Sequence, residues 1–247
     1  MPAQTVMRVV ALCLIAAQAH AETATECLLV EAAFAENRVD DLASLTLQTP
    51  RWQVHQQFRL AAAYIPAEQR RRARKAVLEG LRIANKAIRA NPEDVEMLLM
   101  GAMLDGQILL LSPWRFFHNG LRGLDRLDRA EALDPQNPRA VLVRGTAEVL
   151  LPKFLGGDVD GARGKFLAAL NAHTSTGVPF RASTLCDDGA WAQVDLLNWL
   201  GRANDKLANA AAAQGAYAEA LARSPHNHWV KLAIEGRGYE WSDAELE

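Results

Sequence analysis

Apolar residues recur three and four positions apart along most of the chain, which is the period of helices packed on one side. No segment shows the strict alternation of a half-buried strand, and the composition favours the good helix formers Ala and Leu. Prolines stand where successive helices are expected to end, as at Pro92, Pro135 and Pro225. The pattern therefore predicts an all-α chain.

The expected second helices of successive hairpins share one spacing of side-chain sizes. Each has a small residue, an apolar residue four positions later, and Ala three positions after that. The sets are Gly80, Ala84, Ala87; Gly123, Leu127, Ala130; Ala162, Phe166, Ala169; and Ala213, Tyr217, Ala220, and all but the third continue to a Pro five positions on. Small residues let helices approach closely, and one hairpin cannot bury its apolar face alone. The spacing predicts an irregular helical-hairpin solenoid of about four stacked hairpins.

This spacing resembles the tetratricopeptide repeat (TPR). The resemblance is strong for Val194–Asn227, fair for Val95–Asn137 and Pro138–Thr174, and weaker for the hairpin ending at Pro92. It implies a TPR-like superhelix whose first helices line a concave binding surface. Two turns, around residues 113–120 and 152–157, are longer than the tight turn of that family, so irregular repeats are expected.

A second resemblance rests on Leu133-Asp134-Pro135 and the later run Pro152–Asp158 with Ala162. These segments are similar to periplasmic repeat proteins such as the soluble T component of TRAP-type transporters. That resemblance implies an accessory protein that docks on a substrate-binding protein and holds small apolar ligands.

The first 21 residues have the order of a secretory signal. Arg8 supplies positive charge, Val9–Ala17 is a short apolar run, and Ala19-His20-Ala21 fits a small-x-small cleavage site. We expect cleavage near Ala21 and a single TPR-like repeat domain over residues 22–247, in the periplasm or outside the cell. A buried helix is the alternative interpretation. The mature chain is expected to have no transmembrane segment.

Two cysteines, Cys27 and Cys186, remain after this cleavage. In an oxidising compartment an isolated pair often forms a disulfide. We therefore predict a Cys27–Cys186 bond that ties the first mature helix to a late loop, with two separate buried thiols as the alternative.

The formal net charge is -2, so the charge balance gives no reason to expect a nucleic-acid partner. A local basic run covers Arg70, Arg71, Arg72, Arg74 and Lys75. It is interpreted as a solvated helix face in preference to a patch for an anionic partner.

Candidate chemistry is sparse. His226 and His228 could share a metal ion only in an extended segment, and no third ligand is evident. No serine has a G-x-S-x-G context, and Gly156-Gly157 lacks the Lys of a phosphate loop. We expect no metal, no cofactor and no enzymatic activity.

Two surfaces are candidates for binding. On the first helix of the last hairpin, Asn198, Arg202 and Asp205 could hold a peptide, with a merely solvated face as the alternative. A ligand groove could be built from a second set of residues, although such side chains more often belong to a core. These residues are Met100, Met103, Trp114 and Phe117.

The sequence therefore favours an exported, non-enzymatic binding or scaffold protein. It would act as an accessory subunit of an envelope complex with a protein or peptide partner. The alternative is a periplasmic carrier of a small apolar ligand that works with a TRAP-type transport system. Oligomerisation is left open by these patterns.

Overall fold

The computed structural model describes residues 25–135, 137–175 and 191–236. Within these residues the regular structure is entirely helical, which confirms the all-α prediction. The predicted signal peptide, residues 1–21, and Cys186 lie outside the described residues, so cleavage and the disulfide stay predictions. The other predicted partner, Cys27, is fully buried.

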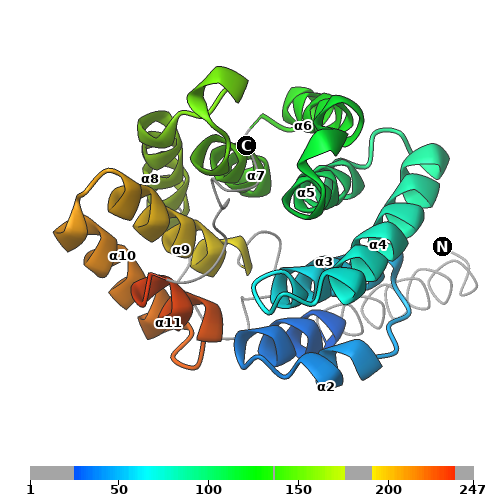
Figure 1. Cartoon of the computed structure of the whole chain (residues 1–247), viewed down its shortest axis with the longest axis horizontal. Helices are drawn as coiled ribbons and strands as arrows, with labels where there is room; N and C mark the ends of the chain where they lie inside the picture. The colour runs from blue at the N-terminus through cyan, green and yellow to red at the C-terminus, as the bar shows by residue number, and fades with distance from the viewer. Residues whose placement is uncertain (1–24, 136, 176–190, 237–247) are drawn as a thin grey trace, which may run out of the picture.

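The helices follow one another with short connections. An N-terminal helix over residues 25–35 precedes the labelled elements of Figure 1. These are α2 (Val39–Ser44), α3 (Pro50–Tyr64), α4 (Arg70–Ala90), α5 (Val95–Leu111), the turns η1 (Pro113–Arg115) and η2 (Phe116–Gly120), α6 (Leu121–Leu133), α7 (Pro138–Leu150), the turn η3 (Lys153–Leu155), α8 (Val159–Ser175), α9 (Trp191–Lys206), α10 (Ala210–Arg223) and α11 (His228–Ile234).

Asx side chains and prolines start several of these helices. Asp94 accepts a hydrogen bond from the Met97 amide at the start of α5, and Asn137 and Asn227 cap α7 and α11 in the same way. Pro66 and Pro92 lie in the connections before α4 and α5, since α4 starts at Arg70 and Asp94 provides the cap of α5.

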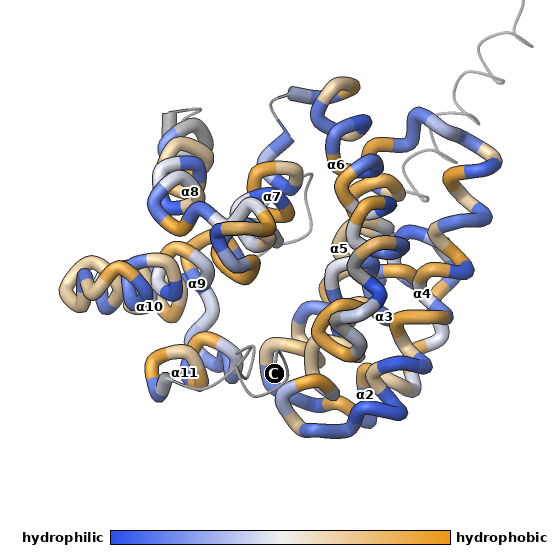
Figure 2. Tube along the Cα trace, turned by 45° about the horizontal axis from the view of Figure 1, so that its top comes forward, coloured by the Kyte–Doolittle hydropathy of each residue, from blue (hydrophilic) through white to orange (hydrophobic). Residues whose placement is uncertain are grey.

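Four helical hairpins can be described: α3/α4, α5/α6, α7/α8 and α9/α10. Large side chains of the second helix lie against glycines of the first. A Cβ added at Gly145 would overlap the Phe166 ring, and one at Gly201 would overlap the Tyr217 ring. The small residues therefore permit the close helix contact that the sequence spacing predicts. Both hydrophilic and hydrophobic positions occur along helices such as α4 and α9, as Figure 2 shows.

The first helices of the hairpins run in parallel. Glu96 of α5 forms ion pairs with Arg51 at the start of α3, at 3.5 Å, and with Arg139 at the start of α7. At the other ends, Arg70 donates to the Leu111 carbonyl at 3.3 Å, and Lys206 donates to the Val149 carbonyl at 2.8 Å. The turns inside the hairpins therefore share one side of the molecule. We call this side, formed by residues 65–69, 112–120, 151–158 and 207–209, the turn edge.

The hairpins curve into a ring that closes on itself. Figure 1 shows the chain passing from α2 around through α6 and α8 to α11, which returns beside the N-terminal part of the chain. Helices α3, α5, α7 and α9 form the inner layer, and α4, α8 and α10 pack outside them. No helix among the described residues has both the length and the apolar character needed to cross a bilayer.

We predict opposite effects for two glycine substitutions in the last hairpin. Gly201→Ala would force the Tyr217 ring to move and should lower the free energy of unfolding by about 1–3 kcal/mol. Gly215→Ala, in open space on α10, should raise it by about 0.5–1 kcal/mol, because Ala is the better helix former. Urea unfolding measures both, and equal effects would contradict the close packing at Gly201.

Candidate functional site

A cavity of about 170 Å³ lies inside the ring. The inner helices α3, α5, α7 and α9 line it, together with α6 and with residues from both ends of the chain, Phe34 and Trp229. Most of the lining is apolar, and much of it comes from Leu, Phe and Trp side chains. The cavity is therefore the concave inner surface of the hairpin stack, and it is partly open to solvent.

The two ends of the cavity differ in chemistry. Toward the turn edge its wall contains leucines from the ends of two inner helices, Leu109 and Leu110 of α5 and Leu150 of α7, with Leu151 just beyond. Toward the ring closure its wall contains Arg59, Asp195, Asn198 and Gln107. The cavity thus has an apolar end and a polar end.

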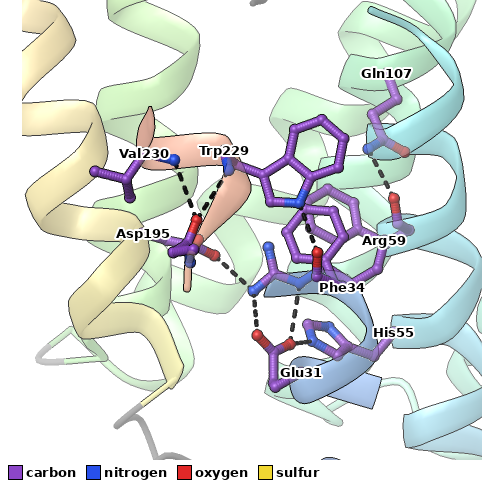
Figure 3. A network of polar contacts seen from close by, with 10 residues as sticks. Glu31, Phe34, His55, Arg59, Gln107, Asp195, Trp229 and Val230 are labelled. Carbon is purple, nitrogen blue, oxygen red and sulfur yellow. Dashed lines mark hydrogen bonds and ion pairs between the residues drawn. The ribbon is translucent and has the colours of Figure 1, made fainter. Parts of the chain in front are cut away.

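The Arg59 guanidinium is the centre of the polar end, as Figure 3 shows. Its Nε and Nη2 donate to Glu31 Oε1 and Oε2 at 3.0 and 2.9 Å, and Nη2 also lies 2.9 Å from Asp195 Oδ2. The guanidinium lies over the Phe34 ring, with the Arg59 Cζ 4.4 Å from the ring centroid. One cation from α3 therefore joins a carboxylate of the N-terminal helix to a carboxylate of α9.

His55 completes the cluster on the side of Glu31. Burial lowers the pKa of His55 to about 4, although Glu31 favours its charged form. The imidazole is therefore neutral at neutral pH, and its Nε2–H donates to Glu31 Oε1. Burial alone would raise the pKa of Glu31, but Arg59 and His55 outweigh it and lower that pKa to about 2.

The pKa of Asp195 is shifted in the opposite direction to that of Glu31. Burial, together with repulsion from Glu31, raises the pKa of Asp195 in spite of its ion pair with Arg59. With both carboxylates ionised and His55 neutral, the cluster has two negative charges against one positive charge. When Asp195 is ionised the cluster therefore has one negative charge in excess, and protonation of Asp195, which its raised pKa favours, would leave Glu31 and Arg59 in balance.

Two aromatic rings seal the same closure. The Trp229 and Phe34 rings stack with their centroids 4.9 Å apart and their planes 12° apart. The Trp229 indole Nε1 donates to the Phe34 carbonyl oxygen at 2.8 Å, a bond drawn in Figure 3. The stack covers apolar area beside Arg59, so water is kept from the ion pairs.

The structure separates the four residues of the expected ligand groove. Met103 lines the cavity, and Met100 is buried in the core. Trp114 and Phe117, in η1 and η2, are exposed on the turn edge and do not line the cavity.

The three residues expected to hold a peptide also have different positions. Asn198 is buried and lines the cavity. Arg202 is half-buried, with its guanidinium carbon 5.6 Å from the Trp199 ring centroid. Asp205 is exposed, and its carboxylate accepts a hydrogen bond from the Tyr217 hydroxyl at 2.7 Å.

Sequence reasoning did not single out Glu31, His55 or Arg59. A charged or imidazole side chain on the apolar face of an expected helix was the available signal, since Arg59 follows Phe58 and precedes Leu60 and Ala61. No protein-family model matches the chain, and no curated protein matches it either. The likeness to tetratricopeptide repeats therefore rests on the residue spacing.

Removal of the central cation should open the ring. Arg59→Met would leave Glu31 and Asp195 buried without their cation, and we expect the free energy of unfolding to fall by about 3–5 kcal/mol. Arg82→Met, which removes an exposed partner of Glu79, should change the stability little, because solvent screens that pair. Urea unfolding compares the two, with Asp195→Asn as a milder variant; equal losses would contradict a closing role for Arg59.

His55 should make the fold sensitive to acid. The unfolded chain binds a proton at His55 near pH 6.5 and the folded chain only near pH 4, so acidification through this interval favours unfolding. We expect a loss of roughly 2–3 kcal/mol between pH 7 and pH 4.5. His55→Gln keeps a donor for Glu31 without the titration, so its unfolding free energy should fall less over the same interval. Parallel pH dependences would contradict this assignment.

Proposed function

We propose that the protein binds a small, largely apolar molecule with a cationic or hydrogen-bond-donating head group in the central cavity. The cavity, with its about 170 Å³ of space, is the observation that supports this. Protein interiors contain few voids larger than one water molecule, and a water occupies roughly 10–15 Å³ by this measure. The space therefore suits one small organic molecule.

The lining gives such a ligand a direction. Leu109, Leu110 and Leu150 favour an alkyl or aromatic part at the end near the turn edge. The head group would lie beside Asp195 and Asn198, where the ring closes. Apolar contact would supply most of the affinity, and the few polar groups would orient the ligand.

The polar end is built to accept hydrogen bonds. Asp195 contributes a carboxylate, and the buried oxygens Gln107 Oε1 and Asn198 Oδ1 have no hydrogen-bond partner among the described residues. Unmet buried acceptors cost about 1–3 kcal/mol each, and a donor on the ligand would relieve that cost after a small rotation of either amide. An anionic head group would instead meet the excess negative charge of Glu31 and Asp195.

The sequence resemblances place this binding activity in a wider proposal. The stacked hairpins would be an irregular TPR-like superhelix, exported after cleavage near Ala21 and bonded between Cys27 and Cys186. Such a protein would act without catalysis, as a periplasmic ligand carrier that works with a TRAP-type transport system. The cavity supports the carrier part of this proposal.

A protein-binding scaffold is the second candidate. Asp205 is exposed and Arg202 is half-buried, so a partner approaching from solvent could contact both. Asn198, the third residue of that expected surface, is buried against the cavity and could meet a peptide only if the ring opened. The carrier function accounts for all the cavity residues and is therefore preferred.

Ligand binding can be tested with probes of equal chain length. Octylamine and octanol should bind and change the fluorescence of the cavity residue Trp199, whereas octanoate should bind about tenfold more weakly because of the negative cluster. Isothermal calorimetry gives the affinities. Equal affinity for octanoate and octylamine would contradict the proposed head-group preference.

Matched variants locate the binding. Ala147→Phe would fill the cavity and should abolish octylamine binding, whereas Ala212→Phe on the exposed face of α10 should leave it unchanged. Asp195→Asn, which retains the Arg59–Glu31 pair, should narrow the preference for octylamine over octanoate. Undiminished binding by Ala147→Phe would show that the ligand site is elsewhere.

A further inference from the structure

The turn edge exposes aromatic side chains to an unusual degree. Trp114, Phe117 and Phe154 are 74%, 82% and 80% exposed. Leu121 follows at the start of α6, and Ile234 is the only other large hydrophobic side chain among the described residues that is more than half exposed. Exposed apolar groups gathered in one region usually mark an interaction surface. Both irregular turns of the chain contribute to this one.

Both turns are held by specific contacts. Asn119 of η2 is buried and donates to the fully buried Asp105 of α5 at 2.9 Å, so the turn that presents Trp114 and Phe117 is anchored. In the other turn Gly156 has a φ of 94°, and a Cβ at Gly157 would overlap the Leu151 carbonyl. The outward position of Phe154 therefore follows from a turn that needs its glycines.

Positive charge lies beside these aromatics. Five exposed cationic residues begin α4, and its first residue, Arg70, reaches the Leu111 carbonyl next to η1. These are Arg70, Arg71, Arg72, Arg74 and Lys75. Cations at a helix N-terminus oppose the helix dipole, and the first turn of α4 contains no acidic residue. The run therefore works against helix stability, which favours a role in binding.

The other charged residues of the turn edge do not cancel the positive charge of the basic run that begins α4. Arg115 lies with its guanidinium carbon 5.0 Å from the Trp114 ring centroid, and Lys153 precedes Phe154. Glu68 is the one acidic residue of the connection between α3 and α4, residues 65–69. Of the other exposed carboxylates nearby, Asp160 is paired with Arg163, whereas Asp158 and Asp205 accept hydrogen bonds from neutral donors and keep their negative charge. These carboxylates are fewer than the cations of the basic run together with Arg115 and Lys153.

We propose that the turn edge docks the protein on a bilayer surface that contains anionic lipids. Exposed aromatic rings among Arg and Lys are the residue types that occupy the membrane–water interface. The basic run would contact lipid phosphates, and Trp114, Phe117 and Phe154 would enter the headgroup layer. This docking is independent of the proposed cavity ligand, although the apolar end of the cavity lies near the same edge.

Vesicle sedimentation tests the docking directly. The exported chain should sediment with vesicles of phosphatidylcholine and phosphatidylglycerol, and much less with phosphatidylcholine alone, and salt should weaken the binding. Mass spectrometry must first show that the leader is absent, because an apolar leader binds lipid by itself. Every variant has the same amino terminus, so differences between variants do not depend on it.

The aromatic contribution is tested by three simultaneous changes. Trp114→Ser, Phe117→Ser and Phe154→Ser together should lower vesicle affinity at least about tenfold. The control changes three exposed apolar residues away from the turn edge, Leu29, Leu133 and Ile234, to Ser and should leave the affinity within about twofold. Brominated lipids should quench tryptophan fluorescence of the natural chain, and Trp114→Phe should remove most of that quenching.

The charge contribution has a matched control on the same helix. Arg71→Glu with Arg74→Glu should lower affinity for the anionic vesicles at least about tenfold. Lys86→Glu with Arg89→Glu makes the same change in charge near the far end of α4 and should have less than about a twofold effect.

Three outcomes would overturn the proposal. They are no binding of the natural chain to anionic vesicles, equal binding with and without phosphatidylglycerol, and equal effects of the two paired charge variants. An acidic protein partner for the turn edge would produce the first of these. Loss of octylamine binding in the cavity would leave the docking proposal untouched, so the two proposals fail separately.

Discussion

The ring depends on the Arg59 guanidinium, where the two ends of the described chain meet. Glu31 reaches it from the N-terminal helix and Asp195 from α9, and the Phe34–Trp229 stack shields both ion pairs from water. A buried ion pair adds little net stability compared with apolar packing, but removing one partner leaves a charge that nothing compensates. The cluster therefore acts mainly on specificity: a ring that closed in another register would bury carboxylates without their cation.

The cavity at the centre of the ring follows from the way the hairpins pack. Glycines such as Gly145 and Gly201 bring the two helices of a hairpin together, so the core lies between the inner and outer layers. The inner faces of α3, α5, α7 and α9 curve around a space that they do not fill. An apolar void costs free energy, because its lining atoms lose contacts, and the wall of this one includes amide oxygens without partners. Those costs are the reason to regard the cavity as a binding site.

The helices and their pairing could be predicted because their causes are local. The spacing that places Tyr217 opposite Gly201 depends on one hairpin, and it can be read within about twenty residues of sequence. The cluster around Arg59 could not be predicted in this way. Asp195 of α9 is separated from Arg59 of α3 by the helices between them. The distance between the two residues therefore depends on the sum of many interhelix angles, which no local sequence pattern specifies. The same limit applies to Met103 and Asn198, which sequence assigned to separate surfaces and the ring brings to one cavity.

The regular and irregular parts of the chain answer different physical demands. Repeated small residues are explained by packing, since each permits a close helix contact. Packing does not explain Phe154 exposed on a glycine-dependent turn, or arginines at the unfavourable end of the α4 dipole. Both features cost stability, and both lie on the side of the ring where the apolar end of the cavity, at Leu110, approaches the surface. Neither feature contributes to the packing of the hairpins, and the docking proposal rests on both. The repeat explains the fold, the cavity carries the proposed ligand binding, and the irregular turns carry the proposed docking.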